Sequence, residues 1–288
     1  MDIIAELTRR GGAARVAQLE RAGISRHRIR AGLETGTVAR PAHGVIALPT
    51  ATSDVVLAVI VGGEHTCVSA LARLGLPVPR RTGPAHLAVP HSFTTYGREM
   101  GATVLHYTKG RKEPGGVATV FAALDSAGDC LDEVWHLVAV DAALNRGLIT
   151  MADVLRLSRT SRARRDFLIA HADARSESPA ETIARLRLVQ AGFQVRPQAY
   201  VDGAGHVDLE VNGILLVQVD GYEHHSDRAS FKRDREKGRA VVKAGRPLLS
   251  YAASELLGQF TANIAVDATR ALEEWRRRTT MRTTNPAA

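Results

Sequence analysis

Apolar residues recur at helical spacing at the start of the chain and predict three short helices there. The first surrounds Ile3–Leu7 and ends at a Gly-Gly pair, and the second surrounds Val16–Leu19. The third is predicted from about Arg26 to Glu34, because Ser25 before it is a good N-cap residue. We therefore expect the chain to begin with a small three-helix unit.

Two short strands are predicted after the third helix, at residues 37–40 and 44–48, with a turn at Pro41–His43 between them. Three helices followed by a β-ribbon are the arrangement of a winged helix-turn-helix, which we predict for residues 1–48. Its third helix would project basic side chains outward or sideways. The predicted DNA-binding residues are Arg26, His27, Arg28, Arg30 and, at the wing, Arg40.

The charge of this segment favours a polyanionic partner. Residues 1–45 hold eight Arg and four acidic residues, which leaves a net charge of +4. Arginine on the second helix of a helix-turn-helix can reach phosphates and guanine edges in the major groove. The alternative is a module that contacts only protein, with arginine on a solvated face.

The same segment resembles the N-terminal winged-helix domain of AbiEi-type antitoxins. Those domains end in a similar Arg-x-x-x-Gly-Val wing, which here runs from Arg40 to Val45. The resemblance covers about 48 residues. It implies a DNA-binding regulator, with a toxin protein or a second copy of the chain as the protein partners to consider.

Residues 49–160 are predicted to be a mixed α/β connector scaffold. Helices are expected at Val55–Val61 and Val68–Leu74, short strands near residues 86–90 and 103–107, and a helical group over residues 117–158. His86, His91 and His106 raise the idea of a metal site, but nothing in their spacing fixes one. We interpret them as surface or hydrogen-bonded core residues and assign no chemistry to this region.

The two cysteines, Cys67 and Cys130, are too few for a cysteine metal quartet or a disulfide scaffold. They are predicted to be buried thiols of a protein in a reducing cytoplasm. The longest apolar run, Val55–Val61, is too short to cross a bilayer, and the N-terminus has no basic segment of the secretory type. We therefore expect a cytoplasmic protein that does not contact membranes.

The Arg- and Ser-rich stretch at 161–179 predicts a boundary, and residues 175–275 are predicted to form a further domain. Ser178, Pro179 and Glu181 fit the N-cap, N1 and N3 positions of a helix that Gly192 ends. The predicted order of elements is α-β-β-β-α-β-α. After the first helix, a short strand is expected at 193–195 and a further strand segment at 198–201, then strands at 206–211 and 214–220, a helix at 227–244, a strand at 247–251 and a helix from 254.

Acidic residues stand where a strand prefers apolar ones. Asp208 lies inside one predicted strand, Gln218 and Asp220 end the next, and the pair His224–His225 follows. Carboxylates at strand ends with histidines nearby suit a site in which a hard metal ion assists cleavage of phosphodiesters.

The combination resembles the restriction-endonuclease-like fold, and more narrowly the branch related to very-short-patch-repair (Vsr) endonucleases. The matching motifs are Ser-Pro-x-Glu, Val-Asp-Leu, a strand ending in Val-Asp-Gly-x-x-His-His, an Arg-Asp-Arg helix and Gly-x-x-x-Leu, over residues 176–260. The predicted fold class is therefore multidomain α/β (α+β), with a winged helix-turn-helix, a mixed connector and a restriction-endonuclease-like domain.

The resemblance implies a site for Mg²⁺ or Mn²⁺. Asp208 takes the place of the metal-binding carboxylate, Val219 that of a ligating backbone carbonyl, and Gln218 that of a third ligand. Asp220 stands where Vsr enzymes have histidine and the broader PD-(D/E)XK pattern has lysine. The other catalytic positions implied are Glu181, His224, His225 and Arg235, with Arg233 and Lys237 beside the last.

Some of these residues also have a structural explanation. Glu181 can serve a capping box, Asp220 can begin a turn, and paired histidines are often solvated. Gln218 stands where related domains often have Glu, and an amide binds Mg²⁺ more weakly because it carries no charge.

The number of residues in the loop between the two strands decides whether Asp208, Gln218 and Asp220 lie on one face of the sheet. A two-residue loop at Asn212–Gly213 would turn Asp208 away from Gln218 and Asp220. A three-residue loop or a Gly-containing bulge places Asp208 opposite Gln218, on the face that carries Asp220. We predict the odd-numbered loop.

The whole chain has 288 residues, a net charge of +8 and a pI near 10. This charge favours DNA as the partner. The leading prediction is a metal-dependent DNA endonuclease with a winged helix. The alternative is a non-catalytic DNA-binding regulator of the antitoxin type with a degenerate nuclease fold, which Gln218 favours.

Overall fold

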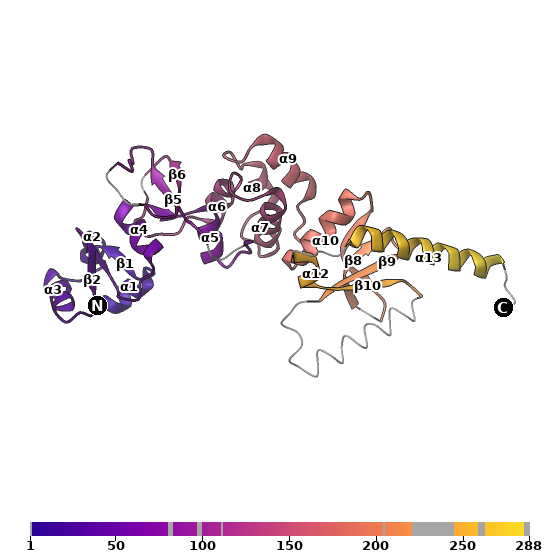
Figure 1. Ribbon diagram of the computed structural model, residues 1–288, viewed down its shortest axis with the longest axis horizontal. Coiled ribbons are helices and arrows are strands. Elements are labelled where there is room, and N and C mark those ends of the chain that lie inside the picture. Colours follow the sequence, from indigo (N-terminus) through magenta and orange to yellow (C-terminus); the bar gives the residue numbers. More distant parts are fainter. Residues whose placement is uncertain are drawn as a thin grey trace. The chain divides into compact units, whose positions relative to one another are not determined.

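A computed structural model describes residues 2–79, 83–96, 100–110, 112–203, 205–220, 245–258 and 263–284. These residues form helices and several small sheets, so the fold is multidomain and mixed α/β as predicted (Figure 1). The chain divides into two compact units. The first comprises Met1–His136 and Ala152–Asp166, and the second comprises Leu137–Met151 and Phe167–Ala288.

The first unit begins with the predicted winged helix. Its elements are α1 (Ile3–Arg9), β1 (Ala13–Arg15), α2 (Val16–Arg21), α3 (Arg26–Glu34), β2 (Ala39–Ala42) and β3 (Val45–Ala47). The strands form an antiparallel sheet in the order β1-β3-β2. All predicted elements are present, and β1 is an additional strand.

Local sequence explains the start and the orientation of α3. The Ser25 hydroxyl accepts a hydrogen bond of 3.3 Å from Arg28 N, which satisfies a backbone donor of the first turn. Ile29 is buried in an apolar cluster with Leu7, Leu19 and Ile46. One face of α3 is thereby held against the domain, and its polar residues face outward.

The predicted elements of the connector region are present, and two further elements were not predicted. In chain order the elements are α4 (Ser53–Val61), β4 (Glu64–His65), α5 (Cys67–Arg73), β5 (Ala85–Pro90), β6 (Thr103–Thr108), α6 (Val120–Ala127), α7 (Glu133–Asn145), α8 (Met151–Leu155) and α9 (Arg162–His171). The two elements that were not predicted are β4 and α9. The strands form a sheet in the order β4-β5-β6, in which β5 and β6 are parallel.

One arginine attaches the winged helix to α4. The Arg15 guanidinium donates to the carbonyl oxygens of Val59 and Ile60, at 2.9 Å and 2.7 Å, near the end of α4. Both carbonyls lie in the last turn of the helix, where the helix dipole makes a cation favourable. Val45 and Val55 are among the buried residues that pack sheet and helix together.

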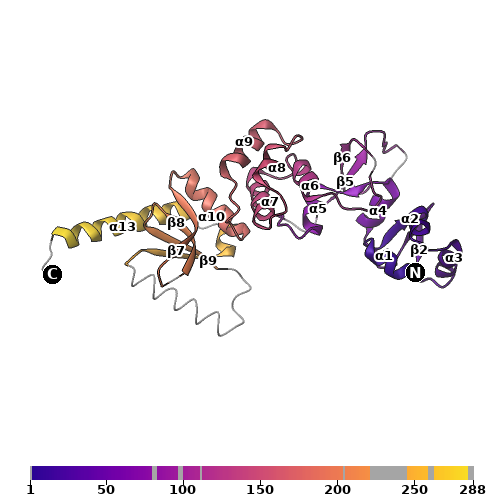
Figure 2. The same ribbon diagram turned by 180° about the vertical axis from the view of Figure 1, so that it is seen from behind.

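The second unit contains a four-stranded sheet. Its elements from residue 179 are α10 (Pro179–Gln190), β7 (Val195–Val201), β8 (Gly205–Val211), β9 (Leu215–Asp220), β10 (Leu248–Ala252), α12 (Ala253–Leu257) and α13 (Ile264–Thr284). The sheet order is β10-β9-β8-β7, and β10 is parallel to β9. Strands β7, β8 and β9 form an antiparallel meander (Figure 2).

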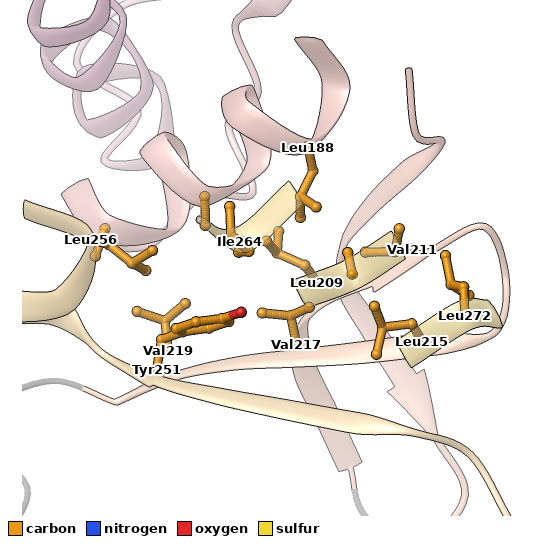
Figure 3. Packing of buried hydrophobic residues seen from close by; sticks show 13 residues of the cluster. Leu188, Leu209, Val211, Leu215, Val217, Val219, Tyr251, Leu256, Ile264 and Leu272 are labelled. Atoms are coloured by element: carbon orange, nitrogen blue, oxygen red, sulfur yellow. The ribbon is translucent and has the colours of Figure 1, made fainter. Parts of the chain in front are cut away.

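This order agrees with the predicted order for the described residues. The predicted helix at 227–244 lies outside them, as do His224, His225, Arg233, Arg235 and Lys237. The apolar face of the sheet is covered by α10, α12 and α13. Figure 3 shows Leu188 of α10 and Leu256 of α12 in the same layer as strand residues such as Val217.

A buried ion pair joins α7 to α10 within this unit. Asp141 of α7 accepts hydrogen bonds from the Arg185 guanidinium at 2.7 Å and the Thr182 hydroxyl at 2.9 Å. It also accepts one of 2.9 Å from Asp173 N. Both charged side chains are almost fully buried, at 1% and 6% exposed. Residues from α7, before the predicted domain boundary, therefore contribute to the polar core of the C-terminal unit.

Candidate functional site

The loop between β8 and β9 has the predicted odd number of residues. Leu209 pairs with Val217 and Val211 with Leu215, which leaves Asn212, Gly213 and Ile214 in the loop. Asn212 and Gly213 both have a left-handed backbone, with φ of 50° and 70°. Left-handed conformations suit Asn and Gly, which explains why this dipeptide permits the three-residue loop. The register prediction is confirmed.

Asp208 and Gln218 are consequently in contact. The Gln218 amide nitrogen donates a hydrogen bond of 2.7 Å to Asp208 Oδ2. Val219 N donates a second one of 2.6 Å to the same oxygen. Asp220 follows two residues after Gln218 at the exposed end of β9, so the two side chains share a face of the sheet.

A third strand brings Gln198 to the same place. Pro197 pairs with Leu209 and Ala199 with Val207, so Gln198 lies in β7 across from Asp208. Its φ of 51° is left-handed, which is uncommon for a residue other than Gly, Asn or Asp. Strain of this kind clusters at functional sites. The sequence carried no signal for it, because a glutamine in a strand is ordinary.

Glu181 connects α10 to this group. Its carboxylate accepts hydrogen bonds from Gln198 Nε2 at 3.2 Å and from Glu177 N at 3.0 Å, and it is only 6% exposed. Ser178 caps the helix by accepting from Glu181 N, as predicted, but the Glu181 carboxylate reaches back to Glu177 instead of Ser178. Burial, followed by the negative charge of nearby Asp208, raises the pKa of Glu181.

We name Glu181, Gln198, Asp208 and Gln218 the acidic group. Four of the predicted positions thus meet or adjoin one another, namely Glu181, Asp208, Gln218 and the backbone of Val219. It is the N–H of Val219, and not its carbonyl, that contacts Asp208. The roles predicted for His224, His225 and Arg235 fall outside the described residues.

The acidic group fits Mg²⁺ only in part. Asp208 and Glu181 supply carboxylate oxygens, which hard cations prefer. Gln218, however, turns its nitrogen toward Asp208, and an amide nitrogen is no ligand for Mg²⁺. The two N–H donors to Asp208 Oδ2 also stabilise part of the negative charge of this carboxylate that a cation would otherwise stabilise. A metal ion at this place would require Gln218 to turn its oxygen inward.

The second candidate surface is the outer face of the winged helix. Arg26, His27, Arg28 and Arg30 of α3 are all exposed, and so is Arg40 at β2. Arg26 forms an ion pair with Glu20 at 2.5 Å. The structure therefore places all five predicted DNA-binding residues at the surface of one module.

A comparison with protein families identifies this module. Residues 1–49 match the family of AbiEi antitoxin transcriptional regulators. The match ends just after β3 and covers 49 of the 288 residues. It confirms the predicted antitoxin-like winged helix. It does not extend to the C-terminal sheet, whose likeness to Vsr endonucleases stays a prediction.

No curated protein matches the chain. In the part of the chain that the structure describes, no helix is long and apolar enough to cross a membrane.

Proposed function

We propose that the protein is a DNA-binding transcriptional regulator of the AbiEi antitoxin type, with α3 as its recognition helix. The observation that carries this proposal is the coincidence of the family match with an exposed basic helix on the same 49 residues. In helix-turn-helix domains the second helix lies in the major groove and its N-terminal residues contact base edges.

The packing of α3 supports a choice among its cations as contacts with DNA. Ile29 is buried, so Arg28 and Arg30 on either side of it project from the module. Arg26 is paired with Glu20, and this pairing lowers its net contribution to a phosphate contact. We propose Arg28 and Arg30, which flank the buried Ile29 and are both exposed, as contacts with DNA on α3, and exposed Arg40 as a contact with an adjacent backbone from the wing.

The acidic group agrees with a regulator that does not cut DNA. Gln218 satisfies Asp208 with a neutral amide donor, so this arrangement needs no cation for Asp208 to be hydrogen-bonded. A toxin protein or a second copy of the chain remains the proposed protein partner.

The test is selection of bound duplexes from a random DNA library by the full chain, followed by fluorescence anisotropy with the selected duplex. Arg28→Gln and Arg30→Gln should each weaken binding at least several-fold. Arg162→Gln removes an exposed cation of α9, at 88% side-chain exposure, and should bind as wild type does. Failure to enrich any sequence, or equal binding by all variants, would refute the proposal.

A metal-dependent DNA endonuclease is the second candidate function. The observation that favours it is that two acids lie close together, so that burial and the negative charge of Asp208 both raise the pKa of Glu181. An acid whose pKa is shifted by burial and by a neighbouring charge is common in active sites. Asp208 would hold Mg²⁺ or Mn²⁺, and Glu181, Asp220 and the histidines at 224 and 225 would manage protons.

Plasmid nicking separates the two candidates. The wild type, Asp208→Ala and the control Asp202→Ala, at an exposed turn, are compared with Mg²⁺ and with Mn²⁺. If the protein is a regulator, none of them cleaves DNA above background. Cleavage by the wild type and Asp202→Ala that is lost in Asp208→Ala would replace the regulator with the nuclease.

A further inference from the structure

Two cysteines and two histidines from distant parts of the sequence meet in the first unit. The ligand atoms of Cys67, His86, His106 and Cys130 all lie within 4.8 Å of one another. His86 Nδ1 is 3.2 Å from His106 Nε2, and Cys130 Sγ is 3.8 Å from the same nitrogen. We call these four residues the Cys/His cluster.

Four different elements bring the cluster together. Cys67 begins α5, His86 lies in β5, His106 lies in β6 and Cys130 follows the end of α6. The parallel pairing places His86 beside Val104 and Ala88 beside His106, so the two histidines are two positions apart on one face of the sheet. Helix α5 contacts both β5 and α6, which closes the group from the other side.

Two of the interatomic distances are close to those of a tetrahedral zinc site. With Zn–N bonds of about 2.0–2.1 Å and Zn–S bonds of about 2.3 Å, a tetrahedron places two nitrogens about 3.3 Å apart. The same geometry places a nitrogen and a sulfur about 3.6 Å apart. The observed 3.2 Å and 3.8 Å lie close to these values.

We infer that Cys67, His86, His106 and Cys130 bind one Zn²⁺ ion in a structural site. Two thiolates balance the charge of the ion, and two imidazoles complete the shell. Sulfur and nitrogen ligands in tetrahedral geometry favour zinc over Mg²⁺ or Ca²⁺, which take oxygen ligands. Four protein ligands leave no position for substrate, so the role is to hold the scaffold together. The inference does not depend on the proposed regulator function.

Three of the four ligands are buried, which supports a structural role, and the fourth gives the ion access from the surface. Cys67 is 0% exposed, and His86 and His106 are 8% and 7% exposed. Cys130 is the most exposed of the four, and together with His86 it lines a pocket shared with Ser69 and Arg73. Zinc and chelators can therefore reach the cluster from this pocket.

The sequence prediction for these residues needs correction. Cys130 is exposed and is not the buried thiol that was expected. His86 and His106 are buried and within hydrogen-bonding distance of each other, as expected, but the fold also gathers them with both cysteines, and no chemistry was predicted there. At least 18 residues separate successive ligands, so the cluster has none of the short Cys-x-x-Cys spacing that marks zinc sites in sequences.

The primary test is the zinc content of the full-length protein, purified without chelators and measured by plasma mass spectrometry. We expect one zinc ion per chain. Cys67→Ala and His106→Ala should lose the zinc. His91→Ala, which removes an exposed histidine just after β5, should keep it.

Cobalt provides a readout that does not depend on how a variant folds. Wild-type protein freed of zinc should bind Co²⁺ with the intense visible bands of tetrahedral coordination and a thiolate charge-transfer band in the near ultraviolet. Zinc should then displace the cobalt. A wild type that holds no zinc and gives no such spectrum would overturn the inference. So would a disulfide between Cys67 and Cys130 in peptides from the protein as purified.

Discussion

The side-chain amide of Gln218 donates a hydrogen bond of 2.7 Å to Oδ2 of Asp208, across the pair of strands β8 and β9. A carboxylate at position 218 would instead place two negative charges side by side, and a cation between them would offset their repulsion. The identity of this one residue therefore bears directly on whether the site depends on metal.

Gln218→Glu should make the stability of the protein depend on Mg²⁺. Without the ion, the variant loses a hydrogen bond and gains a like charge, so the free energy of unfolding should fall by roughly 1–3 kcal/mol. Added Mg²⁺ should raise the melting temperature of the variant more than that of the wild type. Gln194→Glu, at an exposed position, is the control with the same change of charge. A Gln218→Glu protein that melts as the wild type does in both conditions would contradict this prediction.

Glu181→Gln should stabilise the protein at neutral pH. The folded pKa of Glu181 is raised by burial and by Asp208, so the ionised carboxyl destabilises the fold at high pH. The penalty begins as pH rises above the ordinary value of 4.5 and is complete above the raised folded pKa. Urea unfolding from pH 4 to pH 8 should therefore show a gain for the variant that vanishes on the acid side. A constant difference at all pH values would mean that ionisation is not the cause.

Asp141→Ala should destabilise the C-terminal unit strongly. The change leaves the buried Arg185 guanidinium without its carboxylate, and breaking such a pair costs about 3–5 kcal/mol. Chemical denaturation measures the loss. Asp166→Ala serves as the control, because Asp166 forms an exposed ion pair with Arg162 that is worth about 0–1 kcal/mol. Equal effects of the two changes would show that burial does not decide the strength of these pairs.

Arg30→Gln should change the salt dependence of DNA binding. Each phosphate contact adds about 0.9 to the slope of log affinity against log salt, so the variant should have a slope shallower by about that amount. Fluorescence anisotropy between about 50 and 200 mM salt gives both slopes. A loss of affinity with an unchanged slope would indicate that Arg30 contacts a base, or supports the fold, without contacting a phosphate.

Local chemistry explains what could be predicted from sequence. Ser25 fixes the start of α3, Ile29 fixes its buried face, and Asn212–Gly213 permits the odd-numbered loop that brings Asp208 to Gln218. Each of these signals lies within a few residues of the feature that it determines. The antitoxin-like winged helix was predictable for the same reason, and the family match confirms it.

Features that depend on tertiary contacts were not predictable. Strand β1 has three residues, too few to show alternation, and exists because Ala13 and Arg15 pair with β3. The left-handed backbone of Gln198 has no sequence signal either. The Cys/His cluster depends on the pairing of β5 with β6 and on the packing of α5, and both are properties of the folded chain.

The bonds from Arg15 to the end of α4 bear on how the winged helix can be studied in isolation. A fragment cut at residue 49 would uncover Ala13, Val45 and Ala47, which α4 shields in the intact chain. Such a peptide would expose an apolar surface that favours aggregation, and its Arg15 side chain would lack the carbonyl acceptors of α4. A soluble DNA-binding fragment therefore has to extend beyond the family boundary to include α4.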